Sequence, residues 1–326
     1  MPILLTEADV KSLLTMDDLI PAMSTALAAF SARQVQQPLR TVLTIGEQHA
    51  FYGVMPAYIP GTPALGTKLV TVFSGNPARG LTTHLATIVL LDPETGALLS
   101  LMDGRYITEA RTAAVSAVSV QHLARNDASV LAILGTGVQA RSHLEAITKV
   151  RKLEDVRVWS RTSANADTFI HDMKPHVDCP LRKVGSAEEA VRDASIVALT
   201  TASKEPVVYS EWIGDGTHVC AVGACRPAER EMDGALVARA DLYVDSREAA
   251  LAEAGDIVLP IKEGLIRPTH IKAELGEVAG GLVSGRASDH RVTIFKSLGM
   301  AVEDVAAAHL VYQRAMARGV GQVVTL

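Results

Sequence analysis

The distribution of apolar and polar residues divides the chain into three regions, and the first region predicts two helices. Thr6 and Asp9 have the spacing of a capping box, and Thr15 and Asp18 repeat that spacing before a longer helix. Pro21 is expected in the first turn of the longer helix, where proline is tolerated. The apolar residues of this helix recur at the helical period: Leu19, Met23, Leu27 and Phe30.

The second region is rich in residues that favour strands, followed by an Ala- and Val-rich stretch. The sequence Pro93-Glu94-Thr95-Gly96 is typical of a turn, so the strands on either side of it are expected to form a hairpin. A helix from about residue 108 to residue 123 is expected after them. The expected strands are residues 41–45, 66–73, 86–92 and 97–103.

Strands and helices alternate in the third region, which is typical of an α/β fold with a doubly wound parallel sheet. Ser186 and Glu189 are spaced to cap one of these helices. The expected strands are residues 130–134, 156–159, 195–200, 217–222 and 241–245. After Ser246 the pattern is less clear, with a Gly-rich piece at Gly280-Gly281 followed by residues 292–298.

A final helix over residues 302–318 is expected to return to the first part of the chain. We therefore predict a discontinuous α+β domain, residues 1–120 with 301–326, and a Rossmann domain of residues 121–300. The residues expected along one side of the final helix are Val305, His309, Tyr312 and Met316.

The first expected strand of the Rossmann domain runs into a glycine-rich loop that matches the G-x-G-x-x-G/A dinucleotide fingerprint. Gly135 permits a tight turn, Gly137 lets the backbone approach a pyrophosphate, and Ala140 allows close packing of helix and strand. The N–H groups at the start of the helix favour an anion. The residues expected to contact the nucleotide are Gly135, Thr136, Gly137, Val138 and Gln139.

Ser160, Arg161 and Thr162 stand at the end of the second expected strand, where NAD-binding sites usually carry Asp or Glu. An acidic residue accepts hydrogen bonds from the ribose 2′-OH, whereas arginine holds a 2′-phosphate. The sequence therefore favours NADP(H), with NADH as the less favoured cofactor. The alternative is that Arg161 is only a solvated loop residue.

Ligands of parallel sheets bind at the carboxyl ends of the strands. Two segments that immediately follow expected strands are therefore candidate ligand contacts: Thr200-Thr201-Ala202 and Val222-Gly223-Ala224-Cys225.

Composition excludes several classes of protein. Of the 326 residues 48% are hydrophobic and 21% are charged, which is typical of a compact domain rather than a disordered chain. The net charge of -5 gives no indication of nucleic-acid or membrane-surface binding, and we expect no metal site. Cys179, Cys220 and Cys225 are too few for a disulfide framework, so reduced thiols and a cytoplasmic location are expected, without a membrane span or signal peptide.

Three cations occur where a binding role is plausible. Lys68 shares a face of its expected strand with Val70 and Val72, so its ammonium is expected to point into a partly enclosed space. Arg111 is expected in the first turn of a helix, where the macrodipole disfavours a cation unless an anion binds beside it. Arg40 precedes a strand. The alternative is that Arg40 and Lys68 are solvated and that Arg111 pairs with Glu109 or Asp103.

Segments along nearly the whole chain resemble the ornithine cyclodeaminase/mu-crystallin family, closest to its ketimine-reductase side. They are GVMPAY (53–58), LGTKLVTVFSGN (65–76), MDGRYITEARTAAVSA (102–117), GTGVQA (135–140), VWSRT (158–162), AVGACRP (221–227), DSREAALAEAGD (245–256) and FKSLGMAVED (295–304). The resemblance implies a Rossmann domain and a discontinuous domain that binds the substrate and forms a homodimer.

The resemblance also implies roles for individual residues. Arg40, Lys68 and Arg111 match the residues that grip a substrate carboxylate, and we take them as the catalytic set. Ser160, Arg161 and Thr162 match the 2′-phosphate site. The further substrate contacts expected are Met55, His84 and Cys225, although a histidine such as His84 is more often a structural residue than a catalyst. The nicotinamide contacts expected are Val222, Gly223, Ser297 and Leu298.

Two departures from the cyclodeaminase pattern favour imine reduction over ornithine cyclisation. The resemblance implies a Glu at position 53 and an Asp at position 225 in cyclodeaminases, whereas this chain has Gly53 and Cys225. The expected activity is therefore NADPH-dependent reduction of Δ1-pyrroline-2-carboxylate or Δ1-piperideine-2-carboxylate to L-proline or L-pipecolate. The proton donor is left open between Lys68, Cys225 through a water, and an imine protonated in solution. The alternatives are an alanine dehydrogenase, a cyclodeaminase and a non-catalytic NADPH-dependent protein that binds a small ligand.

Overall fold

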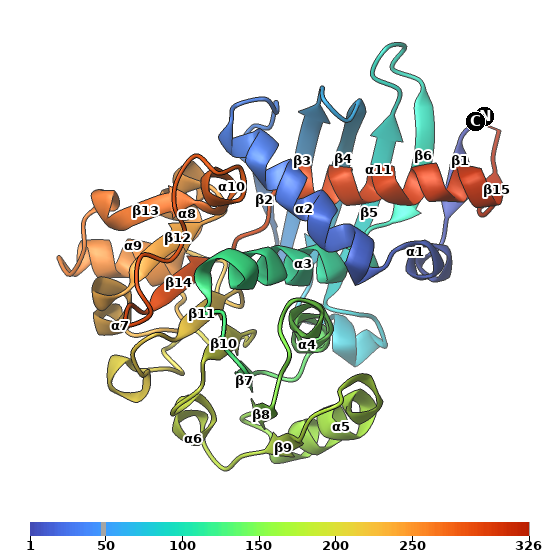
Figure 1. Ribbon diagram of the computed structural model, residues 1–326. Helices are drawn as coiled ribbons and strands as arrows, with labels where there is room; N and C mark the ends of the chain where they lie inside the picture. The colour runs from blue at the N-terminus through green and yellow to red at the C-terminus, as the bar shows by residue number, and fades with distance from the viewer. Residues whose placement is uncertain (47–49, 326) are drawn as a thin grey trace. The chain divides into compact units, whose positions relative to one another are not determined.

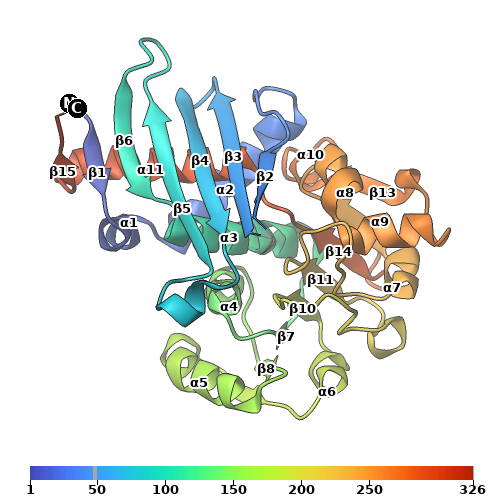
Figure 2. The ribbon, with the colours of Figure 1, turned by 180° about the vertical axis from the view of Figure 1, so that it is seen from behind.

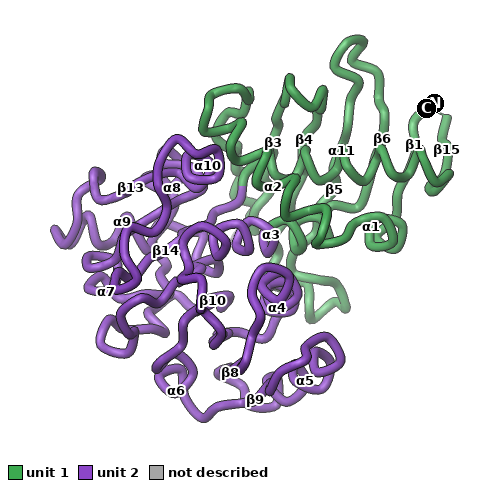
Figure 3. The backbone as a smooth tube through the Cα atoms, viewed as in Figure 1, with its two compact units in different colours: residues 1–111, 300–326 green, residues 112–299 purple. Residues whose placement is uncertain are grey.

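The computed structural model describes residues 1–46 and 50–325, and the chain forms two compact units (Figure 3). Unit 1 contains residues 1–111 and 300–326, and unit 2 contains residues 112–299. The division falls inside helix α3 (Arg105–Leu123), whereas the sequence places the domain boundary near residue 120. A helical pattern that continues through the division gives no signal of where it lies.

Unit 1 is built on a mixed sheet of seven strands in the order β15-β1-β6-β5-β4-β3-β2. β1 pairs with β6 in parallel, and every other neighbouring pair is antiparallel. The strands are β1 (Ile3–Leu5), β2 (Thr41–Ile45), β3 (Ala50–Ile59), β4 (Ala64–Val72), β5 (His84–Leu91), β6 (Leu98–Asp103) and β15 (Gln322–Val323).

Helix α11 (Ala301–Arg318) crosses one face of this sheet and packs against β3, β4, β5 and helix α2 (Met16–Ser31) (Figure 1). Buried residues that stand opposite one another in register point to α11: Met55, Lys68, Ile88 and Met102. We call the opposite face the outer face; Figure 2 shows it with α11 behind the strands. Its half-buried central row is Pro56, Thr67, Val89 and Leu101.

The predicted N-terminal helices are present, with two differences at the second. Thr6 and Asp9 form the expected capping box at α1 (Glu7–Leu13). Thr15 instead donates its hydroxyl to the Asp18 carboxylate and makes no side-chain bond to the backbone of α2. The placement of Pro21 in the first turn was wrong, because α2 begins at Met16 and Pro21 lies inside the helix. The predicted apolar side of α2 is buried: Leu19, Met23, Leu27 and Phe30.

Strand β3 was missed because Pro56, which cannot donate to a ladder, interrupts its pattern. β3 nevertheless pairs with β2 and β4 along its length. The hairpin of β5 and β6 is confirmed, and Asp92 Oδ1 accepts hydrogen bonds from the N–H groups of Glu94 and Thr95, both at 2.9 Å. The turn residues therefore predicted this hairpin correctly, whereas the pattern of apolar residues did not predict β3, which contains a proline.

The predicted side of the final helix was partly wrong. Val305 is buried, but Met316 is 57% exposed. Small residues instead line the buried side, which allows α11 to lie close to the sheet. The buried residues that follow Val305 are Ala307, Ala308, Val311 and Ala315.

Unit 2 has the predicted doubly wound parallel sheet, with eight strands in the order β13-β12-β14-β11-β10-β7-β8-β9. All neighbouring strands are parallel. The strands are β7 (Val130–Leu134), β8 (Asp155–Trp159), β9 (Leu181–Lys183), β10 (Ile196–Leu199), β11 (His218–Ala221), β12 (Asp241–Val244), β13 (Ile271–Glu274) and β14 (Thr293–Lys296).

Two hydrophobic cores lie on the two faces of this sheet, because successive residues of each strand alternate between them. Leu131 and Ile133 belong to one core, and Ala132 and Leu134 belong to the other. Ser186 caps its helix through the N–H of Glu189, as predicted. The helices are α4 (Val138–Val150), α5 (Ser163–Met173), α6 (Ala187–Val191), α7 (Gly234–Arg239), α8 (Arg247–Glu253), α9 (Gly255–Lys262) and α10 (Leu275–Ala279).

The strand order reverses beside β7, which lies between β8 and β10. The chain runs outward through β8 and β9 and then crosses back to β10. The carboxyl ends of β7 and β10 therefore form a topological switch point, where ligands of such sheets bind.

Two further properties concern the chain as a whole. Over residues 1–46 and 50–325, no single helix has both the length and the apolar character that a membrane span needs. Helices α1 and α2 reach that limit only as a pair, and they are bent by 88°. The three cysteines carry free thiols, as expected.

Candidate functional site

The loop between β7 and α4 has the geometry that the dinucleotide fingerprint requires. Gly135 has a φ of 107°, and a Cβ there would lie 2.7 Å from the carbonyl oxygen of Thr200. Gly137 is the N-cap residue of α4 and borders open space, so a ligand can approach its backbone. Ala140 is fully buried against the sheet. The other residues expected to contact a nucleotide here are Thr136, Val138 and Gln139.

Ser160, Arg161 and Thr162 directly follow β8, beside the glycine loop. The Thr136 hydroxyl donates to the Ser160 hydroxyl at 3.5 Å, which joins the two loops. Arg161 and Thr162 are exposed. In the described part of the chain, no carboxylate pairs with Arg161, so its guanidinium is available to an anion.

The remaining predicted cofactor residues lie at the same edge of the sheet. Gly223 lies in the loop that follows β11 and is tightly packed, because a Cβ there would lie 2.1 Å from the Thr201 carbonyl oxygen. The loops after β10 and β11 are therefore in direct contact. Cys225 belongs to the second loop and is exposed, with its sulfur 3.4 Å from the Val222 carbonyl oxygen. The residues that follow β10, β11 and β14 are Thr200, Thr201, Ala202, Val222, Gly223, Ser297 and Leu298.

In unit 1, Lys68 of β4 is buried on the face that α11 covers. Its side chain is 2% exposed, and its Nζ lies 2.6 Å from Oδ2 of Asp304, in the first turn of α11. The alternative of a solvated Lys68 was therefore wrong. The register sets Lys68 opposite Met55 on β3, so these two predicted residues share one face of the sheet.

Arg111 joins the same cluster. Its Nε donates to Oδ1 of Asp304 at 2.9 Å, and its Nη1 donates to Oε2 of Glu303 at 2.6 Å. Among the residues that the structure describes, none accepts a hydrogen bond from Nη2 of Arg111. The N–H groups of Nη2 are therefore the donors of this guanidinium that can receive a carboxylate.

Two expectations for Arg111 were wrong. Helix α3 begins at Arg105, whose N–H is capped by the Asp103 carboxylate at 3.0 Å, so Arg111 lies beyond the first turn. The macrodipole argument therefore does not apply to it. The alternative pairing with Glu109 or Asp103 was also wrong, because Arg111 pairs with acidic residues of α11 that are remote in sequence.

Burial and charge shift the titration of this cluster. Burial lowers the pKa of Lys68 to about 8, although the Asp304 carboxylate opposes this change. Burial would raise the pKa of Asp304, but Arg111 and Lys68 outweigh it and hold that pKa below its usual value. Both partners are therefore charged at neutral pH.

His84 and Arg40 belong to the surroundings of this cluster in unit 1. Burial, together with the charges of Lys68 and Arg111, lowers the pKa of His84 to about 4. His84 is therefore neutral at physiological pH and can donate or accept a hydrogen bond. Arg40 is half-buried, and its charge acts on Lys68.

The sequence did not identify the carboxylates that organise either unit. Glu303 and Asp304 lie within the segment FKSLGMAVED, but nothing in its spacing indicated that they pair with cations near residues 68 and 111. In unit 2, three more fully buried charges were missed for the same reason: Glu231, Asp256 and Lys296.

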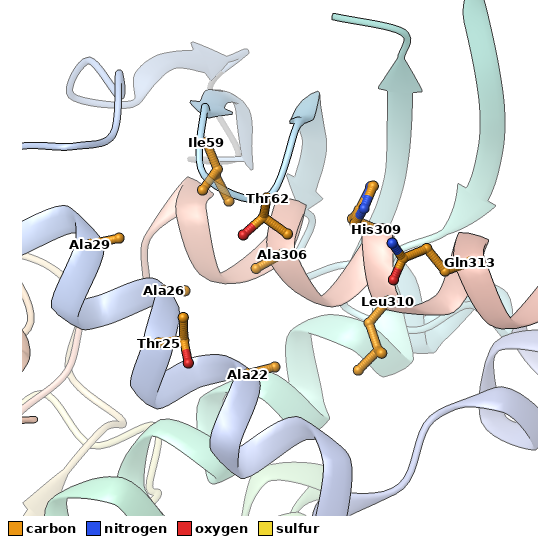
Figure 4. Close-up of a pocket in the computed structure, with 10 residues that line it drawn as sticks. All are labelled: Ala22, Thr25, Ala26, Ala29, Ile59, Thr62, Ala306, His309, Leu310 and Gln313. Atoms are coloured by element: carbon orange, nitrogen blue, oxygen red, sulfur yellow. The ribbon is translucent and has the colours of Figure 1, made fainter.

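A separate pocket of about 180 Å³ lies in unit 1 between α2, α11 and the end of β3 (Figure 4). The predicted substrate residues do not line it. Alanines and Thr25 from α2 face His309, Leu310 and Gln313 from α11. We therefore keep the Lys68 and Arg111 cluster as the candidate substrate site.

The chain is similar to known proteins over nearly its whole length. The sequence model of the ornithine cyclodeaminase/mu-crystallin family matches residues 1–319. The ketimine reductase mu-crystallin of Rattus norvegicus is 46% identical over 297 residues, which cover 90% of this chain and 91% of that protein.

Solved structures agree over the whole chain. The Δ1-pyrroline-2-carboxylate reductase of Thermococcus litoralis, in complex with NADH and L-proline, superposes with a TM-score of 0.96 at 39% identity, covering 99% of this chain and 100% of that one. An archaeal alanine dehydrogenase dimer with bound NAD has a TM-score of 0.94 at 34% identity, covering 99% of both chains.

Proposed function

This chain belongs to the ornithine cyclodeaminase/mu-crystallin family, and from that premise we propose that it reduces cyclic ketimines that carry a carboxylate. The substrates are Δ1-pyrroline-2-carboxylate and Δ1-piperideine-2-carboxylate, the products are L-proline and L-pipecolate, and NADPH is the preferred reductant. The observation that carries the proposal is the buried Lys68 and Arg111 pair in a chain that also has the dinucleotide loop.

The charges of the cluster favour an anionic substrate. Arg40, Lys68 and Arg111 supply three positive charges, and Glu303 and Asp304 supply two negative ones. The excess positive charge and the donors of Arg111 Nη2 suit one carboxylate. Binding the carboxylate at fixed donors orients the attached C=N bond, so binding energy supplies orientation.

Reduction of a ketimine adds a hydride to C2 and a proton to the ring nitrogen. When bound, NADPH supplies the hydride and becomes NADP+. The residues of this chain hold the carboxylate and keep the imine carbon in a defined position. The proton comes from Lys68, from Cys225 through a water, or from an imine protonated in solution; Lys68, with a pKa of about 8, is able to donate at neutral pH.

The surroundings of Gly53 favour this reaction over ornithine cyclisation. Gly53 lies on the same face of β3 as Met55, and a Cβ there would lie 3.0 Å from Cγ1 of Val70. A glutamate at this position would therefore require Val70 to move. Cys225 offers a weak hydrogen-bond partner in place of a carboxylate.

A substrate panel tests the proposal. NADPH oxidation should be measured with each cyclic ketimine, and ammonia release should be measured with ornithine on the same preparation. We expect rapid oxidation with at least one ketimine and no ammonia from ornithine. Ammonia release at a comparable rate, or NADH oxidation with pyruvate and ammonia alone, would assign the chain to a cyclodeaminase or an alanine dehydrogenase instead.

For the cofactor, we expect a higher kcat/KM with NADPH than with NADH, because Arg161 has no acidic neighbour to repel a 2′-phosphate. Arg161→Ala should reduce the preference by about 1.5–3 kcal/mol, as expected for a hydrogen bond to a charged group. kcat/KM with NADH should stay near the wild-type value, which is the internal control. A wild-type enzyme that prefers NADH would contradict this assignment.

For the pH dependence, we expect kcat/KM to fall as the pH rises past about 8, where Lys68 loses its proton. The free energy of unfolding should rise between about pH 8 and 10.5, because over that range the unfolded state holds the proton of Lys68 more tightly. Lys68→Arg should move the loss of activity to higher pH, since arginine stays charged. If kcat/KM of Lys68→Arg falls at the same pH as in wild type, the group that titrates is the imine of the substrate.

The outer face of the unit 1 sheet supports a homodimer. A sheet face that meets water normally carries polar residues. The outer face here carries apolar side chains that the chain itself only half buries: Val54, Leu69, Val89 and Leu101. A second copy of the same face is the simplest partner, since symmetric pairing of one patch with itself closes the assembly. The archaeal alanine dehydrogenase, similar over the whole chain, is a dimer.

We expect Val89→Arg to shift the protein from dimer to monomer, because it places a charge in the centre of the outer face. Sedimentation or light scattering measures the change. Val138→Arg, on an exposed residue of unit 2, is the matched control and should leave the assembly unchanged. A Val89→Arg protein that stays dimeric would place the interface elsewhere.

A further inference from the structure

Glu231 is a fully buried carboxylate at the carboxyl edge of the unit 2 sheet. Its Oε1 accepts hydrogen bonds from the N–H and the hydroxyl of Thr201, both at 2.7 Å. Its Oε2 accepts hydrogen bonds from the N–H groups of Gly223 at 2.6 Å and Ala224 at 3.2 Å. An ionised carboxylate offers about four lone-pair sites, and the four donors occupy all of them, so Glu231 has its full set of hydrogen bonds.

One carboxylate therefore joins the loops that follow β10 and β11. The two loops also touch directly, because the space beside Gly223 is filled by the Thr201 carbonyl oxygen and by Glu231. Movement of either loop breaks at least two hydrogen bonds to Glu231. The relative position of the two loops thus depends on this side chain.

A buried ion pair holds Glu231 in place. Asp256 Oδ1 accepts hydrogen bonds from the N–H groups of Glu231 at 2.8 Å and Met232 at 3.1 Å. Asp256 Oδ2 lies 3.1 Å from Nζ of Lys296, which also donates to the Ala224 carbonyl oxygen at 2.5 Å. Lys296 ends β14 and precedes Ser297, so a third strand end is tied to the same network.

We propose that Glu231 is a positioning residue that sets the strand-end loops of unit 2 against the nicotinamide half of the cofactor, with Asp256 and Lys296 holding it. The inference rests on the proposed function, because Val222, Gly223, Ser297 and Leu298 are the residues expected to meet the nicotinamide, and Thr201 is a candidate contact of the cofactor. The adenosine half is expected on the loops after β7 and β8, whereas the hydrogen bonds that the Glu231 carboxylate accepts come from the loops after β10 and β11.

The test compares two nucleotides that differ only in the nicotinamide. The affinities of NADP+ and of 2′-phospho-ADP-ribose are measured by titration calorimetry on wild type and Glu231→Gln. The amide of glutamine cannot accept hydrogen bonds on both sides, so one loop loses its acceptor. We expect Glu231→Gln to weaken NADP+ roughly tenfold or more while it leaves 2′-phospho-ADP-ribose within about twofold of wild type.

Steady-state kinetics supply a second readout. kcat for the ketimine should fall by a similar factor in Glu231→Gln, with the KM of the ketimine nearly unchanged, because the carboxylate site in unit 1 is intact. Glu229→Gln is the matched control; it neutralises a nearby carboxylate that pairs with Arg226 and should change neither nucleotide affinity. If Glu231→Gln does not fold, Thr201→Val removes one of the four bonds and should shift NADP+ affinity alone, about threefold or more.

Each outcome decides the inference. Equal weakening of both nucleotides, or no weakening of either, would overturn it and leave Glu231 as a purely structural residue. Because these titrations contain no imine, they stand even if the substrate proposal fails. A wild-type protein that binds neither nucleotide would instead overturn the proposed function.

Discussion

Arg111→Ala should lose ketimine reduction by on the order of a hundredfold or more in kcat/KM, while NADP+ binds with wild-type affinity. The substitution removes the only guanidinium of the buried pair, and with it the donors of Nη2 that are available to a carboxylate. Since the carboxylate orients the imine, the loss should appear in kcat as well as in KM.

Arg111→Lys is the informative companion variant. It keeps the positive charge that Glu303 and Asp304 need, but it lacks the planar fork. We expect it to remain folded and still to lose most activity. If Arg111→Lys were as active as wild type, the charge alone would suffice, and a requirement for the Nη2 donors would be excluded. If Arg111→Ala reduced the ketimine normally, the carboxylate site would lie elsewhere.

Asp304→Ala should produce the largest loss of stability, about 3–5 kcal/mol in the free energy of unfolding. Asp304 is completely buried and forms ion pairs with two cations at once, Lys68 and Arg111. Without it Lys68 loses its carboxylate beneath α11 and Arg111 keeps its ion pair with Glu303, and a buried unpaired charge costs far more than a surface one. Urea denaturation of the wild type and the variant measures the difference.

Asp167→Ala is the matched surface control, because Asp167 pairs with Lys183 at 2.6 Å but is 60% exposed. It should change the free energy of unfolding by about 0–1 kcal/mol. The pKa of Asp304 is held below its usual value of 3.8, so its stabilising contribution is present above that pH and is lost as acid protonates the folded protein. Equal effects of the two substitutions would contradict the importance of the buried cluster.

The parts of the fold that the sequence predicted depend on local chemistry. Gly135 could be assigned because the fingerprint states a backbone requirement, and its φ of 107° satisfies that requirement. The hairpin of β5 and β6 followed from Asp92 and the turn residues after it. The strands of unit 2 followed from buried apolar runs that a parallel sheet demands.

The parts that were missed depend on contacts between distant segments. The partners of Lys68 and Arg111 lie on α11, about two thirds of the chain away. Nothing in the segment FKSLGMAVED indicates that its acidic residues pair with cations so remote in sequence. The start of α3 was set too late because Asp103 was read as the end of a strand, whereas it also caps the helix. Sequence reasoning thus singled out these cations but could not find the carboxylates that pair with them.

The division of unit 1 between the two ends of the chain has a consequence for synthesis on the ribosome. Residues 112–299 form one uninterrupted segment, so unit 2 is complete in sequence before residues 300–326 emerge. Until α11 emerges, Lys68 and Arg111 have neither Asp304 nor Glu303, and the strands that α11 covers are bare. Vectorial translation therefore makes the nucleotide unit the first that can fold in full, while the sheet of the nascent first unit stays uncovered until α11 emerges.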